Sequence, residues 1–399
     1  MGKTSLEVIW NKIVSETKSA QIMTGKHSGL VKNFLINDVY YRESAFAAKI
    51  FAVEYKKTNN SEYLERAQLS LNSLQTIFLD TDLTNGINEP TFSPRGIKYR
   101  KGSIPATIIL IYAIEKASEL INFNFKYDIY AVIKFLESCY LRNGRFYHDK
   151  IETHKKYPRI VNTTSMAYFF LEYSKIKGIR TNFYTKEIEN IRNAILNSQR
   201  IDGFFPYVEP GVVQKIFYIF NRLYPAKLIR AYNIILRDNS IFFGDALHHL
   251  IVLYYYIVGC YYRNSDLSKK EIRLLNKGYK FIKNYLKEEN DFIYFDFSWE
   301  PKPTHLRYCN FIDTSTYFYL LDFLRYMYKF NLISKEEKHR ISNGILNHIS
   351  KNLLRDSSPS INPYQGGEDF IHLIIPRPSE SIFDKGFFLS DLMLEEANG

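Results

Sequence analysis

A carboxylate and two imidazoles follow one another closely at the start of a strongly apolar stretch of the sequence. Asp245 is followed by His248 and His249, and residues three or four positions apart share one face of a helix. A carboxylate beside an imidazole fixes its tautomer and raises its basicity, which suits proton transfer near neutral pH. We predict that His248 is the general acid/base residue and that Asp245 orients it. The alternative is an acid at a helix start followed by histidines of the core.

A second group of chemically useful side chains lies between residues 296 and 313. Carboxylates, an indole, a phenol and a guanidinium occur there within one predicted loop. Paired carboxylates supply the acid and the base when a glycosidic bond is broken, and aromatic rings stack on sugar faces. We predict Glu300 and Asp313 as catalytic carboxylates, and Trp299 and Arg307 as substrate-binding residues. For Asp313, a helix cap remains an open alternative.

Two basic loops add positive charge. One spans residues 94–101, with four cations and a tyrosine, and the other spans residues 145–159. Such loops suit a carboxylate, sulfate or phosphate group on a ligand, although a solvated loop is the alternative. The predicted substrate-binding residues in these two loops and in the loop that follows are Arg95, Tyr99, Tyr147 and Tyr207.

Motifs for metals and cofactors are absent from the sequence. The three cysteines, Cys139, Cys260 and Cys309, are far apart and have no short Cys/His spacing, which speaks against structural zinc and a disulfide framework. Neither phosphate-binding glycine loops nor a Rossmann glycine pattern, a nucleophile elbow or a zinc-protease helix motif occurs. We therefore expect no cofactor and no metal.

The net charge of +11 and the pI of about 9.2 raise the question of nucleic acid. The cations are spread over many predicted surface helices, with acids between them, so nucleic acid is not an expected partner. The N-terminal residues lack the pattern of a signal peptide. The longest apolar run, residues 250–262, is shorter than the roughly 20 residues of a membrane span. We predict a soluble cytoplasmic protein.

Helices must position these residues, because helical periodicity dominates the sequence. Two kinds of predicted helix alternate. Amphipathic helices are expected at 5–22, 60–79, 125–140, 184–199, 267–288 and 334–354, and helices apolar on nearly every side at 38–57, 103–121, 162–177, 245–262, 313–330 and 385–396. A helix that is apolar all round must be surrounded by protein, whereas a striped helix lies at the surface.

This alternation through about six helical hairpins predicts a closed ring. The fold class we predict is all-α: an (α/α)6 toroid, or α/α barrel, with long loops before the inner helices. An open solenoid of helix pairs is the competing architecture. No linker-like segment divides the chain, so we expect one domain over residues 1–399, with an insertion at 211–237. Residues 291–299 predict a short strand, and hence a small β-hairpin decoration.

The segment Gln199–Phe205 resembles the Q-x-x-D-G-x-F turn that recurs in α/α toroid proteins. That superfamily includes six-hairpin glycosidases, polysaccharide lyases, uronyl epimerases, terpene cyclases and protein prenyltransferase β subunits. The resemblance covers about seven residues, implies the toroid fold and identifies no single family. The acidic D-x-D-D motif of terpene cyclases is absent, because Asp80–Leu83 lacks the final carboxylates. The Cys/His zinc ligands of prenyltransferases and lanthionine cyclases are not recognisable either.

Together these patterns predict an intracellular enzyme that acts on an acidic sugar or oligosaccharide as a lyase, an epimerase or a hydrolase. Proton transfer would take place where the long loops meet. Two alternatives remain open: a cyclase or modifying enzyme for a peptide or terpenoid, and a non-enzymatic scaffold that binds a partner. The sequence does not specify the oligomeric state.

Overall fold

The computed structural model describes residues 4–33, 38–93, 96–141, 143–150, 161–179, 183, 185–200, 202–205, 246–296, 312–356, 360–362, 364–365 and 382–398. Within these ranges, no helix combines the length and the apolar character that a membrane crossing requires. The predicted insertion at 211–237 lies outside the described residues.

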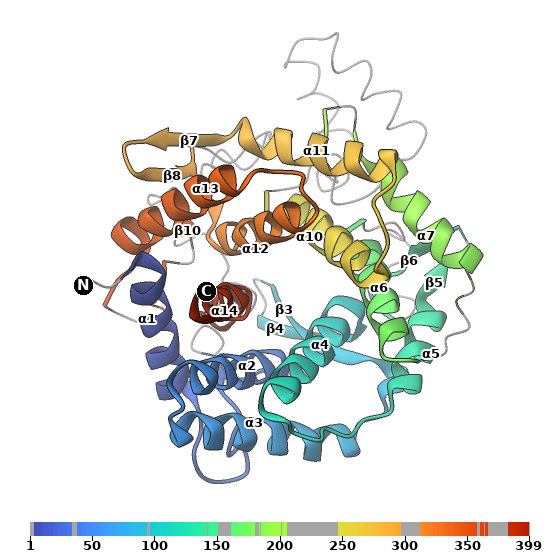
Figure 1. The fold of residues 1–399 in the computed structure, drawn as a ribbon. Coiled ribbons are helices and arrows are strands. Elements are labelled where there is room, and N and C mark those ends of the chain that lie inside the picture. The colour runs from blue at the N-terminus through green and yellow to red at the C-terminus, as the bar shows by residue number, and fades with distance from the viewer. Residues whose placement is uncertain are drawn as a thin grey trace.

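The predicted ring of alternating helices is confirmed (Figure 1). Its inner helices are α2 (Tyr41–Thr58), α4 (Ile104–Ile121), α6 (Val161–Ile176), α10 (Ala246–Arg263), α12 (Ser315–Lys329) and α14 (Ile382–Asn398). Its outer helices are α1 (Ser5–Ala20), α3 (Ser61–Leu79), α5 (Ile129–Cys139), α7 (Thr185–Ser198), α11 (Lys269–Lys283) and α13 (Lys335–His348). Each inner helix packs on the next, and α14 packs back on α2, so the ring is closed rather than open.

Several inner helices end in the same way, which makes the repeat visible in the backbone. Helices α2, α4, α10 and α12 are each followed by an asparagine with a left-handed backbone: Asn59, Asn122, Asn264 and Asn331, with φ between 54° and 56°. Asparagine tolerates this conformation better than most residues and frees the chain to turn back. A single local signal therefore ends four inner helices and starts the return to the outer layer.

The Gln199–Phe205 motif joins consecutive outer helices. The Gln199 side-chain amide donates to the carbonyl oxygens of Gly203 and of Leu274 in α11, both at 2.9 Å. Gly203 has a φ of +99°, and a Cβ at this position would lie 2.3 Å from the carbonyl oxygen of Lys277. Only glycine allows the turn to approach α11 so closely. The motif that carries the family resemblance therefore has a structural role, because it attaches the turn after α7 to α11.

The same kind of attachment between a turn and an outer helix occurs at the first hairpin. Gln21 follows α1, and its side-chain amide donates to the carbonyl oxygen of Arg66 in α3 at 3.0 Å. A Cβ on Gly29 would lie 2.3 Å from the carbonyl oxygen of Leu69. The pair Gln21/Gly29 therefore attaches the turn after α1 to α3 in the same way as the pair Gln199/Gly203 attaches the turn after α7 to α11.

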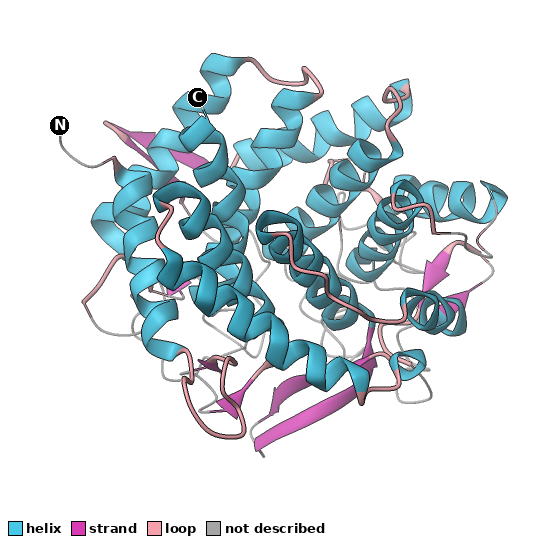
Figure 2. Ribbon diagram, turned by 60° about the horizontal axis from the view of Figure 1, so that its bottom comes forward, coloured by secondary structure: helices cyan, strands magenta, loops and turns pink. Residues whose placement is uncertain are grey.

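The strands form two-stranded antiparallel hairpins at the periphery of the helices (Figure 2). The longest pair is β3 (Ile87–Ser93) with β4 (Gly96–Ser103), and the predicted decoration is β7 (Leu286–Glu289) with β8 (Phe292–Phe295). Short pairs are β1 (Lys32–Asn33) with β2 (Asp38–Val39), β5 (Tyr140–Leu141) with β6 (Arg145–Phe146), and β9 (Ile312–Asp313) with β10 (Tyr364–Gln365). Short helical turns lie at η1 (Leu83–Asn85) and η3 (Ile349–Leu353).

Two predictions made from the sequence are wrong. The helix expected at 267–288 ends at Lys283, because Leu286–Glu289 pairs with Phe292–Phe295 around Asn290, whose φ is 53°. The basic run 94–101, expected as a loop, lies mostly within strand β4. In both places cross-strand pairing outweighs the local preference of the sequence.

Aromatic rings fill the interior of the ring. Phe387 and Phe388 of α14 contact rings on four other inner helices: Phe46 at 4.6 Å, Tyr112 at 6.1 Å, Tyr254 at 5.4 Å and Tyr319 at 4.0 Å between centroids. Such contacts add edge-to-face attraction to the burial of apolar area. The last inner helix therefore packs on inner helices from both the N-terminal and the C-terminal part of the chain.

Candidate functional site

The inner helices begin at one end of the ring. Tyr254 of α10 contacts Tyr319 of α12 at 5.6 Å, and one step of seven residues further along both helices Tyr261 contacts Tyr326 at 5.3 Å. This equal step shows that the two helices run in parallel. Because inner and outer helices alternate along the chain, the other inner helices share the direction. We call the end formed by their first turns the mouth.

His249 faces away from the interior. Its Nδ1 accepts a hydrogen bond from the backbone N–H of Phe205 at 3.0 Å, and its Nε2 lies 3.3 Å from the carbonyl oxygen of Gly278 in α11. The imidazole therefore carries its proton on Nε2. It is fully buried and stacks on Phe204 at 5.3 Å. These contacts give His249 a structural role between α10 and the outer layer.

His248 lies on a different face of the same helix. Consecutive helical residues are turned by about 100°, whereas residues seven apart return to nearly the same direction. His248 thus shares a face with Tyr255, whose ring contacts Phe169 of α6 at 5.3 Å and Tyr319 of α12 at 6.4 Å. His248 is partly exposed. Its place suits the predicted proton transfer, and its role stays a prediction.

Four side chains from four inner helices come together at the level of the mouth. Arg42 is the second residue of α2, Asp384 the third of α14 and Tyr319 the fifth of α12. The charges of Arg42 and Asp384 act on the hydroxyl groups of both Tyr319 and Tyr255. Tyr255 lies in the third turn of α10, so α10 extends further outward than α2, α12 and α14. We call Arg42, Tyr255, Tyr319 and Asp384 the floor cluster.

The rings of the two phenols in the floor cluster lie side by side, with 6.4 Å between their centroids. Burial raises the pKa of Tyr255, and the charge of Asp384 adds to the rise, while the charge of Arg42 opposes it. Burial raises the pKa of Tyr319 further, and Tyr255 and Asp384 add to the effect. Both phenols are protonated at neutral pH.

A buried imidazole and carboxylate lie between the starts of α4 and α6. The backbone carbonyl of His148 accepts from the N–H of Ile104 at 3.0 Å, which ties this segment to α4. His148 Nδ1 lies 2.7 Å from Thr163 Oγ1 in α6, and His148 Nε2 lies 3.8 Å from Asp149 Oδ1. Only 6% of His148 and 3% of Asp149 are exposed. This second basic loop therefore fixes the distance between two inner helices.

Asp313 makes the helix-capping contact. It lies in β9, directly before α12, and its Oδ1 accepts from the backbone N–H of Ser315 at 2.8 Å. A carboxylate at this position satisfies a free amide of the first helical turn. Helix capping therefore explains the contact of one carboxylate oxygen of Asp313. Its predicted catalytic role stays a prediction.

The other predicted site residues are placed only in part. The backbone N–H of Tyr147 donates to the carbonyl oxygen of Cys139 at 2.9 Å, and its partly buried side chain packs on the core. Tyr99 lies in β4 opposite Pro90 of β3. Outside the described residues lie Arg95, Tyr207, Asp245, Trp299, Glu300 and Arg307. Their predicted roles are therefore untested.

Sequence reasoning did not select Arg42, Tyr255 or Tyr319. A signal for Arg42 existed, because a charged residue at the start of an otherwise apolar inner helix needs a buried partner. The seven-residue spacing from His248 to Tyr255, which places both residues on one helix face, was also visible in the sequence. Their meeting with Tyr319 and Asp384, however, depends on the closure of the ring.

Among the described residues, no group of three His, Cys, Asp or Glu side chains is arranged to hold a metal ion. The side chains described at the mouth are an imidazole and two phenols, with one buried guanidinium and one buried carboxylate.

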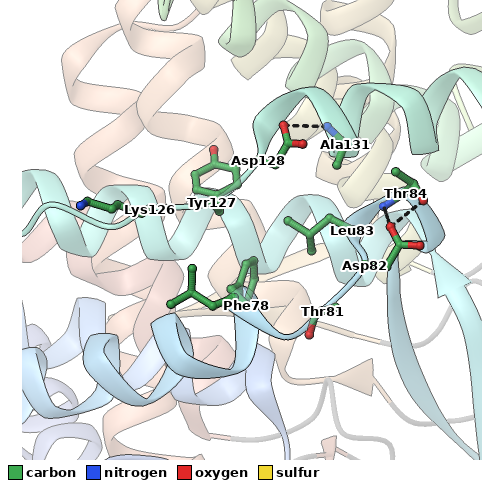
Figure 3. Close-up of a pocket in the computed structure, with 10 residues that line it drawn as sticks. Phe78, Thr81, Asp82, Leu83, Thr84, Lys126, Tyr127, Asp128 and Ala131 are labelled. Atoms are coloured by element: carbon green, nitrogen blue, oxygen red, sulfur yellow. Dashed lines mark hydrogen bonds between the residues drawn. The ribbon is translucent and has the colours of Figure 1, made fainter.

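A cavity of about 490 Å³ lies elsewhere, in the outer layer between the end of α3 and the start of α5 (Figure 3). Its two carboxylates cap helical turns: Asp82 accepts from the backbone N–H of Thr84 at 3.0 Å, and Asp128 from that of Ala131 at 3.1 Å. Every lining residue belongs to the outer layer or its connections. We therefore place the candidate site at the mouth and not in this cavity.

Comparison with known proteins gives the fold. No protein-family model matches the sequence, and no curated protein does. Among solved structures, the unsaturated glucuronyl hydrolase from Streptococcus agalactiae is 12% identical, with a TM-score of 0.61 over 98% of this chain and 91% of that one. The cellobiose 2-epimerase from Bacillus thermoamylovorans is 8% identical, with a TM-score of 0.60 over 98% and 100%.

A third similar structure is an inactive α-1,6-mannanase from Salegentibacter, solved with α-1,6-mannotriose, which is 8% identical with a TM-score of 0.57 over 98% and 99%. These proteins catalyse different reactions, so the likeness extends to the architecture and not to one activity. The resemblance expected from the Gln199–Phe205 motif is confirmed at that level. The chain has the α/α toroid fold, and no specific family within it follows from these similarities.

Proposed function

We propose that this protein is an enzyme that acts on an acidic sugar or oligosaccharide by general acid/base catalysis at the mouth of the ring. The observation that supports this most is the position of His248. It stands on the inward face of an inner helix, close to the mouth and two turns from the floor cluster. An imidazole is the side chain best suited to exchange protons near neutral pH. The proposed orienting partner is Asp245.

The shared fold supports a saccharide as the substrate. The similar structures include a glucuronyl hydrolase, an epimerase and a mannanase. The acidic character of the sugar rests on separate grounds, namely the basic hairpin β3–β4 before α4 and the basic segment 145–159 before α6. Guanidinium and ammonium groups in such loops pair well with a carboxylate. The proposal also keeps the other predicted site residues: Arg95, Tyr99, Tyr147, Tyr207, Trp299, Glu300, Arg307 and Asp313.

A terpenoid or peptide cyclase fits the interior less well. Such an enzyme would hold an apolar intermediate in a nearly uncharged chamber. Arg42 and Asp384, only 5% and 6% exposed, place opposite charges in the wall of the ring. A binding scaffold remains distinguishable by experiment, because it would not depend on the imidazole of His248.

The test is a substrate screen with matched histidine variants. Wild-type protein is incubated with neutral and uronate-containing oligosaccharides, and three products are measured: a new double bond by ultraviolet absorbance, a new reducing end, and uptake of solvent deuterium at carbon. His248→Gln should lower the rate by about 10²–10⁴-fold. His249→Gln, on the outward face, should keep its rate per folded molecule. Turnover of uronate substrates that His248→Gln leaves unchanged would refute the proposal.

A further inference from the structure

The strand pair β9–β10 lies beside the first turn of α12, at the mouth, and carries Asp313. In this pair Tyr364 lies opposite Asp313, and Gln365 is the last residue of β10. Thr314 Oγ1 also donates to the backbone carbonyl oxygen of Asn362 at 2.7 Å. Asp313 is partly exposed. The place of this predicted catalytic carboxylate therefore depends on how β10 is held.

Gln365 is held through both ends of its side-chain amide. Its Nε2 donates to the backbone carbonyl oxygen of Phe295, at the end of β8, at 3.1 Å. Its Oε1 accepts from the hydroxyl of Tyr317 in α12 and lies 3.1 Å from His348 Nε2 at the end of α13. A backbone carbonyl only accepts, so the Phe295 contact fixes which end of the amide carries the nitrogen. One side chain thereby attaches β10 to three other elements.

The contacts of His348 agree with this orientation. Because Gln365 Oε1 accepts, the imidazole carries a proton on Nε2, and its Nδ1 accepts from Asn352 Nδ2 at 3.0 Å. The ring stacks on Tyr294 at 5.2 Å and contacts the ring of Tyr317 at 5.7 Å between centroids. Only 6% of His348 is exposed. A buried network whose members are paired in this way specifies one arrangement of the elements that carry it.

Tyr317 completes the network. Its hydroxyl accepts from the backbone N–H of Phe295 at 3.0 Å and donates to Gln365 Oε1. Its ring contacts that of Phe295 at 5.2 Å between centroids, and both side chains are fully buried. The N–H and the carbonyl of Phe295 are thus both bound, one by Tyr317 and the other by Gln365. These contacts leave β8, β10 and the start of α12 little freedom to move apart.

Gln21 provides a matched comparison in the outer layer. Its side-chain amide is also hydrogen-bonded at both ends: Nε2 donates to the carbonyl oxygen of Arg66 at 3.0 Å and to Ser70 Oγ at 2.9 Å, and Oε1 accepts from Arg66 Nη1 at 2.9 Å. All of these contacts attach the turn after α1 to α3. Gln21 and Gln365 therefore have similar bonds, and only those of Gln365 lead to the mouth.

We propose that Gln365 is a positioning residue of the mouth, whose side-chain amide fixes the β9–β10 pair on β8, α12 and α13 and thereby sets the place of Asp313. This assignment rests on the proposed function, in which Asp313 is a catalytic carboxylate. Gln365 acts through Asp313 and not on the substrate. A displacement of about 1 Å at a reacting group costs about 10²-fold in rate, so a loosened strand pair should be visible in kcat.

The experiment is a double-mutant cycle in the full chain, on a saccharide that the wild type converts. Gln365→Met removes the hydrogen bonds of the amide and keeps a similar length. It should lower kcat per folded molecule by about 10–100-fold, with KM within about threefold. In the Asp313→Asn background, which keeps a helix-capping side chain, the same replacement should lower kcat by less than about threefold, because coupled residues are not additive. Gln21→Met should lower the melting temperature and keep kcat per folded molecule.

Tyr317→Phe is a milder variant that decides the question even where Gln365→Met does not fold. It removes the hydroxyl between Phe295 and Gln365 and keeps the ring, so its loss in kcat should be smaller and should also vanish in the Asp313→Asn background. Equal losses in both backgrounds, or wild-type kcat in Gln365→Met or in Asp313→Asn, would overturn this assignment alone. If the wild type converts no saccharide in the screen, the proposed function fails and the assignment fails with it.

Discussion

Lys49 Nζ lies 2.8 Å from Asp391 Oδ1, and this contact joins the first inner helix to the last. Lys49 is only 2% exposed, and burial lowers its pKa despite the nearby carboxylate. Asp391 also accepts from Arg325 Nη2 at 3.0 Å, and Arg325 Nε lies 2.6 Å from Asp322 Oδ1. The ring is therefore closed by charge as well as by aromatic packing.

Replacing Asp391 should destabilise the fold. In Asp391→Asn, Lys49 stays buried but loses its ionised partner, and breaking a buried pair typically costs about 3–5 kcal/mol. Urea denaturation measures the loss in the free energy of unfolding. The control is Asp356→Asn, whose pair with Lys12 at 3.1 Å is exposed and should cost no more than about 1 kcal/mol. Equal losses in both variants would contradict closure by this ion pair.

The same carboxylate predicts a loss of stability in acid. Burial alone would raise the pKa of Asp391, but the charges of Lys49 and Arg325 outweigh it and hold the pKa at about 2. The ordinary value in an unfolded chain is about 3.9. A group with a lower pKa in the folded state stabilises the fold above its unfolded pKa. That contribution is lost as the pH falls from about 4 to 2.

Melting temperatures between pH 6 and pH 2 check this expectation. The difference between wild type and Asp391→Asn should be constant above about pH 5 and should shrink as the pH approaches 2. The wild type will still lose some stability for other reasons. One is Glu271, whose pKa is also held at about 2, because hydrogen bonds from Arg263 and Ser268 outweigh its burial. A difference that does not change with pH would show that Asp391 is not the titrating group.

Alanine at Gly203 should cost more than alanine at Gly178. Both glycines have a positive φ, +99° and +72°, so both variants carry the backbone penalty of about 1–2 kcal/mol. At Gly203 the new Cβ would also lie 2.3 Å from the Lys277 carbonyl oxygen, whereas Gly178 has nothing within 4 Å. The difference in unfolding free energy between the variants therefore measures the steric cost that arises from the close approach of the turn to α11. If the two losses are equal, the turn does not constrain the helix spacing.

Leucine at His249 should destabilise the protein more than leucine at His248. His249→Leu leaves the Phe205 N–H without its acceptor and the Gly278 carbonyl without its donor, and each buried unpaired group costs about 1–3 kcal/mol. His248 is partly exposed on the other face, so its loss should stay near 0.5 kcal/mol, as at most surface positions. Thermal unfolding of both variants decides the comparison. A reversed order would mean that the face assignment of α10 is wrong.

Periodicity was enough to place most helices. The helix predicted at 103–121 is observed as Ile104–Ile121, and the one predicted at 245–262 as Ala246–Arg263. Here an unbroken apolar stretch and a clear stop signal act locally. The β3–β4 hairpin was missed because Pro90 and the basic residues of 94–101 have low strand preference. Pairing across the turn, which no local window contains, decides that segment.

The candidate site was predictable only where local spacing defines it. The choice between His248 and His249 depends on one helix and can be argued from seven-residue spacing to Tyr255. The floor cluster depends on Arg42 and Asp384, from opposite ends of the chain, lying near the same two phenols. Their positions depend on six successive hairpins, so small errors in the predicted angle of each hairpin add up.

Asp391 and Phe387 belong to the last of the inner helices to leave the ribosome. The side chain of Lys49 also donates to the backbone carbonyl of Phe387 at 3.3 Å, across 338 residues. During translation, Lys49 and the aromatic wall of α2 therefore stay without their partner until α14 emerges. In that interval α14 from another copy can bind to the side of α2 on which α14 normally packs, which would give a domain-swapped dimer. Slow synthesis or high local concentration should favour that product over the closed monomeric ring.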